Sequence, residues 1–181
     1  MRSSTTLLIL FLAALLSCKN TSPKTAKAEI PVTEATYYLI RHADKERGPD
    51  AGTDPDLTDK GLARAEFWAQ TLKDVDFDAV YSTDFVRTRK TAMPVAEAND
   101  LALTIYDAQN LYDDKFKQET AGKTVLIVGH SNTTPAFVNS ILGEDQYGEI
   151  DDSLFGNLYI VKIKNGAAQA ELQDYNDWSF D

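Results

Sequence analysis

The sequence predicts an α/β fold of three layers, with a mostly parallel central sheet between two layers of helices. From Thr36 onward, short apolar runs alternate with helical patterns, as in chains whose parallel strands are joined by crossover helices. Residues 124–128 (TVLIV) are apolar without interruption, which indicates a strand buried on both faces. The 181 residues, 43% hydrophobic and 25% charged, suit one domain with a substantial core.

The strand predictions rest on β-branched and aromatic residues. Four parallel strands are expected at residues 37–40, 79–81, 103–106 and 124–128. A hairpin is expected near the end of the chain, with strands at 158–163 and 169–172. The dipeptide Asn165-Gly166 between them is typical of a two-residue hairpin turn.

The helix predictions rest on capping residues and on apolar spacing. Thr58 can cap a helix whose buried face holds Leu62, Ala65, Ala69 and Leu72. Further helices are expected at 85–98, weakly at 111–119, and at 135–142. Pro94 is expected to kink or end the first of these, because proline cannot donate the helical hydrogen bond.

The first residues predict an export signal rather than part of the fold. Arg2 is the only charged residue before Cys18, and residues 7–16 (LLILFLAALL) are apolar throughout. This run is too short to span a bilayer, which takes about 20 residues, but it suits a signal peptide. Residues 15–18 (LLSC) resemble the bacterial lipobox, in which cleavage precedes a cysteine that carries lipid. The alternative is a secreted protein with an incidental cysteine.

These patterns divide the chain into a signal peptide at 1–17, a lipidated Cys18 with a flexible tether to residue 35, and a domain at 36–181. We therefore expect an extracytoplasmic protein, anchored to a bacterial membrane through Cys18. Lys19 replaces the aspartate that often retains lipoproteins at the inner membrane, which favours the outer membrane.

Composition limits the partners and the chemistry. The net charge of −10 argues against nucleic acid and anionic lipid as major partners, so the membrane contact is expected through the lipid alone. A single cysteine allows no internal disulfide and no cysteine-based metal site. Histidine chemistry is confined to the two histidines in the chain.

Both histidines follow predicted strands. Arg41-His42 comes directly after the first strand, and Gly129-His130 directly after the strand at 124–128. Arg87 begins a helix shortly after another strand. Because ligands bind at the carboxyl ends of parallel strands, these side chains are expected on one rim of the sheet. Arginine binds phosphate oxygens bidentately, so the set indicates an anionic substrate.

Four segments resemble the histidine phosphatase superfamily, whose fold is phosphoglycerate-mutase-like. Residues 37–44 (YYLIRHAD) resemble its Arg-His-Gly signature, with Ala43 in the glycine position. Residues 56–65, 78–92 and 128–132 resemble its later motifs, in the family's order. The resemblance spans about 36–143 and implies the same three-layer fold.

The resemblance implies a role for each residue. His42 would be the nucleophile that becomes phosphohistidine, Arg41 and Arg87 would hold the phosphoryl oxygens, and His130 would stabilise the transition state. Ser131 could contact the phosphate through its hydroxyl or its backbone N–H. With charge supplied by these side chains, no metal and no cofactor are expected.

The acid that protonates the leaving group is harder to place. Asp107, at the end of the 103–106 strand, is the first choice, and Asp44 and Asp113 are the alternatives. Asp107 could equally be a helix cap.

The sequence thus predicts a metal-independent phosphatase that acts on small phosphorylated substrates. The alternative is a phosphate-binding envelope lipoprotein that keeps the pocket without turnover.

Overall fold

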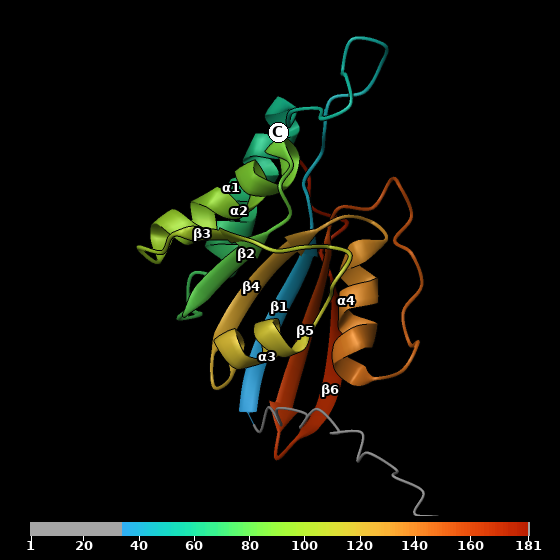
Figure 1. Ribbon diagram of the computed structural model, residues 1–181. Coiled ribbons are helices and arrows are strands. Elements are labelled where there is room, and N and C mark those ends of the chain that lie inside the picture. Colours follow the sequence, from blue (N-terminus) through green and yellow to red (C-terminus); the bar gives the residue numbers. More distant parts are fainter. Residues whose placement is uncertain (1–33, 181) are drawn as a thin grey trace, which may run out of the picture.

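The computed structural model describes residues 34–180, and this part of the chain contains one six-stranded sheet (Figure 1). The strands lie in the order β3-β2-β4-β1-β5-β6. Their bounds are β1 (Glu34–Arg41), β2 (Ala79–Ser82), β3 (Leu103–Ile105), β4 (Thr124–Gly129), β5 (Asn157–Lys164) and β6 (Ala167–Asp174). Strands β3, β2, β4 and β1 pair in parallel, whereas β5 pairs antiparallel with both β1 and β6.

Four helices cover the two faces of the sheet. They are α1 (Asp59–Thr71), α2 (Val86–Ala98), α3 (Asp114–Thr120) and α4 (Thr133–Leu142). Helices α1 and α2 cover one face, and α3 and α4 cover the other (Figure 1). The predicted three-layer α/β fold with a mostly parallel sheet is therefore confirmed.

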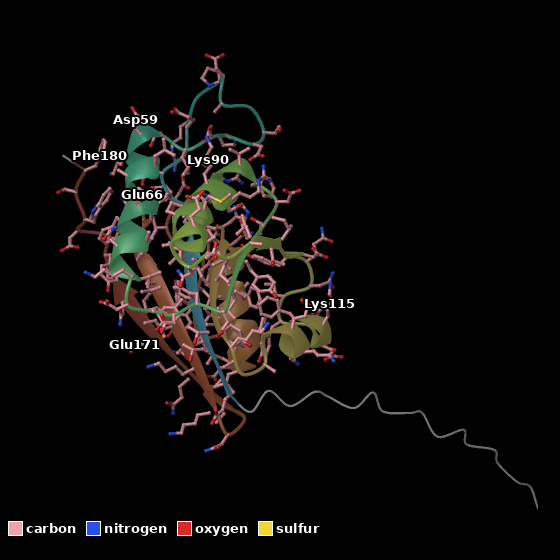
Figure 2. The ribbon with its side chains drawn as sticks, turned by 90° about the vertical axis from the view of Figure 1, so that its left-hand side faces the viewer. Asp59, Glu66, Lys90, Lys115, Glu171 and Phe180 are labelled. Atoms are coloured by element: carbon pink, nitrogen blue, oxygen red, sulfur yellow. The ribbon has the colours of Figure 1, made fainter. Side chains whose placement is uncertain are left out.

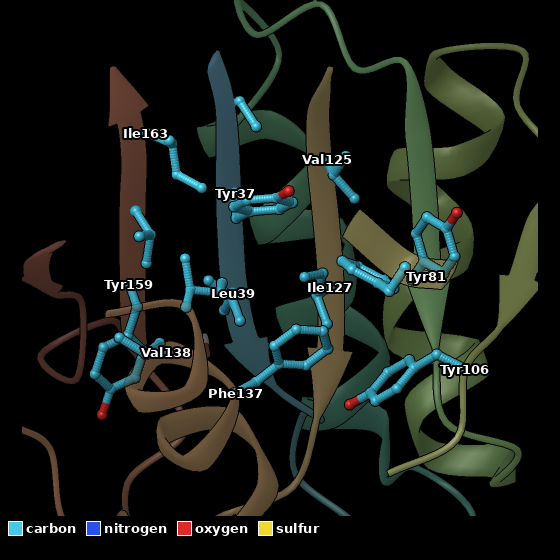
Figure 3. Packing of buried hydrophobic residues seen from close by; sticks show 14 of the residues in the cluster. Tyr37, Leu39, Tyr81, Tyr106, Val125, Ile127, Phe137, Val138, Tyr159 and Ile163 are labelled. Carbon is cyan, nitrogen blue, oxygen red and sulfur yellow. The ribbon is translucent and has the colours of Figure 1, made fainter. Parts of the chain in front are cut away.

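Alternating residues of the central strands feed two separate cores. In β4, Val125 and Ile127 pack with α3 and α4, as Figure 3 shows around Phe137. Leu126 and Val128 point the other way and pack with α1 and α2. All four side chains are at most 1% exposed, because helices cover both faces of the sheet and exclude solvent from each face of the strand.

Helix α1 begins as predicted, and three of its four predicted core residues, Ala65, Ala69 and Leu72, are buried. The Thr58 side chain accepts a hydrogen bond from the Gly61 N–H at 3.0 Å, and so caps the helix. Leu62, predicted to be buried, is 45% exposed, and Arg64 is buried in its place. The prediction for Leu62 was wrong because apolar spacing overlooked an arginine that has an internal ion-pair partner.

Pro94 lies inside α2 without ending it, and the helix ends at Ala98 as predicted. One boundary differs from expectation. Strand β1 begins at Glu34, so the last two residues assigned to the tether belong to the sheet.

The predicted hairpin is confirmed. Asn165 and Gly166 both have positive φ, at 54° and 78°, as a two-residue type I′ turn requires.

The C-terminal segment closes over α1. Trp178 lies against Phe67, and Tyr175 packs against both Phe67 and Trp68. Figure 2 shows Phe180 beside α1, with Lys115 of α3 on the opposite side of the molecule. Within residues 34–180, no helix is long and apolar enough to cross a membrane.

Candidate active site

The site begins where two neighbouring parallel strands end. Arg41 is the last residue of β1 and pairs with Gly129, the last residue of β4. The His42 N–H donates to the Gly129 carbonyl at 2.9 Å. This register places His42 and His130 side by side, with ring centroids 5.4 Å apart.

His42 is held with one ring nitrogen free for attack. Its Nδ1 lies 2.8 Å from the Ala43 carbonyl oxygen, which can only accept, so Nδ1 carries the proton. In the neutral ring, Nε2 therefore has an available lone pair. Burial, together with the charges of Arg41 and Arg87, lowers the pKa of His42 to about 3. The residue as a whole is 3% exposed. With this lowered pKa, the ring is neutral at physiological pH.

The Arg41 guanidinium is buried and anchored from one side. Its Nη1 donates to the carbonyl oxygens of Asp151 and Leu154, at 3.0 and 2.9 Å. Its Nη2 donates to the Asp152 carboxylate at 2.7 Å, and the Phe155 ring lies 4.3 Å beneath it. These contacts fix its orientation while Nε, which is also buried, has no hydrogen-bond partner.

His130 and Arg87 form the second half of the site. Arg87 Nη2 lies 3.4 Å from His130 Nδ1, and because a guanidinium only donates, Nδ1 is the acceptor. His130 Nε2 then donates to the Thr83 hydroxyl at 2.9 Å. Burial and the nearby arginines lower the pKa of His130 to about 4. The backbone N–H of His130 donates to Thr133, which holds the start of α4 against the ring.

These side chains line an open pocket of about 490 Å³. The Nε atoms of both Arg41 and Arg87 are buried without an acceptor, although each is a strong donor. Lys45 lines the same pocket, and burial and Arg47 lower its pKa. Unsatisfied guanidinium donors beside a neutral imidazole are suited to an anion that the imidazole can attack.

The low histidine pKa values predict an acid-sensitive fold. Each imidazole is neutral in the folded protein and protonates near pH 6.5 when unfolded. Their contribution to stability is thus present above pH 6.5 and is lost as the pH falls toward 4 and 3. We expect NMR titration of the imidazole carbons to give both midpoints below pH 5. A midpoint near 6.5 for either ring would contradict the described burial.

The three carboxylates predicted as leaving-group acids do not line this pocket. Asp107 accepts from the Gln109 N–H and the Asn110 amide, which lower its pKa, and it lines a neighbouring cavity. Asp113 caps α3 through the Phe116 N–H and lines that same cavity. A separate ion pair holds Asp44.

Asp44 is held below α1. Its carboxylate accepts from Arg64 Nε at 2.6 Å and lies 3.5 Å from the Lys60 ammonium. The backbone carbonyl of Asp44 accepts from the Thr58 N–H. This residue thus joins the Arg41-His42 loop to the start of α1 and does not face the substrate pocket.

The structure adds residues that the sequence did not indicate. Asp54 accepts from Arg87 at 3.2 Å, and Asp152 bridges Arg41 and Arg47. Glu149 lines the pocket and accepts from the Ser131 hydroxyl at 3.0 Å. All three acids lie in irregular segments, where neither periodicity nor a preceding strand marks them. In the sequence, only the crowding of aspartates at 50–59 marks any of the three, and it marks Asp54 alone.

No group of three or more histidine, cysteine or acidic side chains within residues 34–180 could hold a metal ion. The site therefore has cationic donors for an anion but, in the described chain, no ligand set for a cation.

The first half of the domain matches a known family. Residues 37–113 match the model of the histidine phosphatase superfamily (branch 1). Phosphoserine phosphatase 1 of Hydrogenobacter thermophilus is 39% identical over 67 residues, which cover 35% of this chain and 32% of that protein. The chain thus spans about a third of the length of this curated relative.

Solved structures with the same fold cover most of the chain. An α-ribazole phosphatase from Shigella flexneri superposes with a TM-score of 0.62 at 15% identity, covering 81% of this chain and 99% of its own. A phosphoglycerate mutase from Bacillus anthracis gives 0.58 at 16%, covering 78% and 93%. A putative phosphohistidine phosphatase SixA from Agrobacterium tumefaciens gives 0.52 at 22%, covering 70% and 90%. At these identities the likeness concerns the fold alone.

Proposed function

We propose that this chain, whose residues 37–113 match the model of the histidine phosphatase superfamily (branch 1), hydrolyses phosphate monoesters through a phosphohistidine on His42. The observation that carries the proposal is the pair of buried, unpartnered guanidinium Nε–H groups beside an imidazole whose Nε2 is free. A phosphoryl group supplies the oxygens that these donors lack and the phosphorus that the imidazole attacks.

The first step transfers the phosphoryl group to the enzyme. His42 Nε2 attacks phosphorus while the bond to the ester oxygen breaks. Arg41 and Arg87 neutralise the charge on the equatorial oxygens, which is the main catalytic need in phosphoryl transfer, and the neutral His130 stabilises these oxygens by hydrogen bonding. The Ala43 carbonyl accepts a hydrogen bond from Nδ1–H and so stabilises the positive charge that His42 gains on phosphorylation.

The second step is hydrolysis of the phosphohistidine. Water attacks phosphorus, the P–N bond breaks, and His42 returns to the neutral imidazole. The strongly lowered pKa of His42 supports this step, because the ring that leaves phosphorus stays unprotonated and can act as the nucleophile in the next cycle.

Small phosphorylated compounds are the proposed substrates. The pocket volume of about 490 Å³ suits a small molecule, and the partial relative is a phosphoserine phosphatase. The exposed Phe85 ring borders the pocket and lies edge-on to His130, with centroids 5.0 Å apart. It can contact an apolar part of the leaving group.

Hydrolysis of p-nitrophenyl phosphate in the presence of EDTA tests the proposal. The full chain is expected to turn over this substrate at an unchanged rate after metal removal, because the cationic groups are protein side chains. Activity that EDTA abolishes and Mg²⁺ or Zn²⁺ restores would contradict the metal-independent route.

A phosphate-binding protein without turnover is the second candidate. The observation that favours it is the position of Asp107, the expected acid, outside the pocket. This candidate predicts that inorganic phosphate binds, as measured by calorimetry, while no phosphate ester in a broad panel is hydrolysed.

We also propose that Cys18 carries a lipid that anchors the protein to the bacterial membrane, with the outer membrane favoured. Support comes from the apolar run at 7–16 and from residues 15–18, which lie outside the described residues. Radiolabelled palmitate is expected to enter the wild-type chain and not the Cys18→Ser variant. Label in both variants would reject lipidation at this residue.

A further inference from the structure

Two carboxylates from the loop between α4 and β5 line the candidate active site, Glu149 and Asp152. Resting on the proposed phosphatase function, we propose that Glu149 is the catalytic acid that protonates the leaving group. The assignment depends on what holds each of the two carboxylates and on where the other acids of the site lie.

Asp152 forms ion pairs with two arginines. Its oxygens accept from Arg41 at 2.7 Å and from Arg47 at 2.5 Å. These two guanidinium groups hold the pKa of Asp152 well below its usual range. A carboxylate that stays ionised between two cations has no proton to donate, so Asp152 positions Arg41 instead.

Glu149 has no cationic partner among the described contacts and is held by neutral donors. The Ser131 hydroxyl donates to Oε1 at 3.0 Å, which leaves the second carboxyl oxygen for a proton. Ser131 directly follows His130, and Glu149 lines the same pocket as the His130 and His42 rings.

The backbone holds Glu149 in the same place. The N–H of the next residue, Ile150, donates to the Ser131 carbonyl at 2.9 Å. The Ile150 side chain is buried in the core beneath α4, with 5% exposure. Two bonds to Ser131 and one buried side chain therefore fix the loop over the start of α4.

The other acids near the site are engaged elsewhere. Asp54 accepts from Arg87 and from the Val86 N–H at the start of α2. Asp107 and Asp113 form their bonds at the neighbouring cavity, and Asp44 is paired with Arg64. Within residues 34–180, two acids line the pocket that contains His42, and of these Glu149 is the one without a cationic partner.

The proton balance closes over the two steps. In the first, the P–O bond to the leaving group breaks as the P–N bond to His42 forms, and Glu149 gives its proton to the departing oxygen. In the second, the Glu149 carboxylate takes a proton from the water that attacks phosphorus. Products are an alcohol and inorganic phosphate, and Glu149 is protonated again.

Leaving-group dependence tests this role. Glu149→Gln keeps an oxygen that accepts from Ser131 but removes the acid. It is expected to lower kcat/KM about 10²–10³-fold for phenyl phosphate, whose leaving oxygen needs a proton. For 2,4-dinitrophenyl phosphate, whose phenolate leaves unprotonated, the loss is expected to be less than about threefold, because general-acid assistance is not needed there.

Glu144→Gln is the matched control, with the same substitution in the same loop away from the pocket, and it should retain both activities. Equal losses on both substrates in Glu149→Gln would indicate a structural role, and no loss would remove Glu149 from the mechanism; either overturns the assignment. So would a leaving-group-dependent loss in Asp107→Asn. If the wild-type chain hydrolyses neither ester, the proposed phosphatase function itself fails.

Discussion

Replacing His42 with asparagine is expected to abolish turnover of p-nitrophenyl phosphate, with a fall in kcat of about 10⁴–10⁶-fold, as for other enzymes that lose their nucleophile. The asparagine amide N–H can still donate to the Ala43 carbonyl, so the local backbone keeps its partner. What disappears is the Nε2 lone pair that would form the P–N bond.

The phosphoenzyme gives the direct measurement. Wild-type protein mixed with a ³²P-labelled ester and quenched in alkali is expected to retain label, because phosphohistidine survives alkali but not acid. The His42→Asn variant should retain none. His130→Asn is the informative comparison, since it removes a stabilising group but leaves the nucleophile, and it should still become labelled slowly. Equal turnover in wild type and His42→Asn would point to another nucleophile.

Replacing Gly61 with alanine is expected to destabilise the domain by about 3 kcal/mol or more, at or beyond the usual upper end for overpacking. A Cβ at this position would lie 2.0 Å from the Asp44 carbonyl oxygen and 3.1 Å from Leu57 Cβ. The first of these is a backbone atom, so no side-chain rotation relieves the clash. The first turn of α1 and the Arg41-His42 loop would have to separate.

Thermal unfolding measures the effect, with an expected fall in Tm of about 6–12 °C for a domain of this size. Catalytic activity should fall too, because Asp44 is two residues from the nucleophile. Gly148→Ala is the matched control, since a Cβ there meets nothing within 4 Å, and its Tm should stay within about 2 °C. A Gly61→Ala variant as stable as wild type would mean that α1 packs less closely than described.

The elements with strong local signals were predictable. The apolar run at 124–128 became the buried strand β4, and Asn165-Gly166 became the hairpin turn, because both depend on neighbours in the sequence. The four residues at the centre of the site were predictable for a related reason. Arg41 ends β1, His42 and His130 directly follow β1 and β4, and Arg87 lies in the first turn of the helix after β2. The parallel arrangement of these strands brings their ends together.

The partners of these residues were not predictable. Asp152, Glu149 and Asp54 belong to irregular segments, where no periodicity says which way a side chain points. Asp107 illustrates the opposite error, since its position after a strand suggested the site. Its carboxylate instead accepts hydrogen bonds from the Gln109 N–H and the Asn110 amide in the turn that follows.

The sequence by itself determined the three-layer architecture and placed Arg41 and both histidines at strand ends, and it predicts an anionic ligand. These follow from hydrophobic periodicity and from the charge of particular side chains, which are local properties. Only the tertiary structure decided which side chains bind the nitrogens of His130 and which acid lies beside which cation. These outcomes depend on contacts between residues far apart in the sequence, such as Arg41 with Asp152 and His130 with Thr83, and the order of residues alone does not give such contacts.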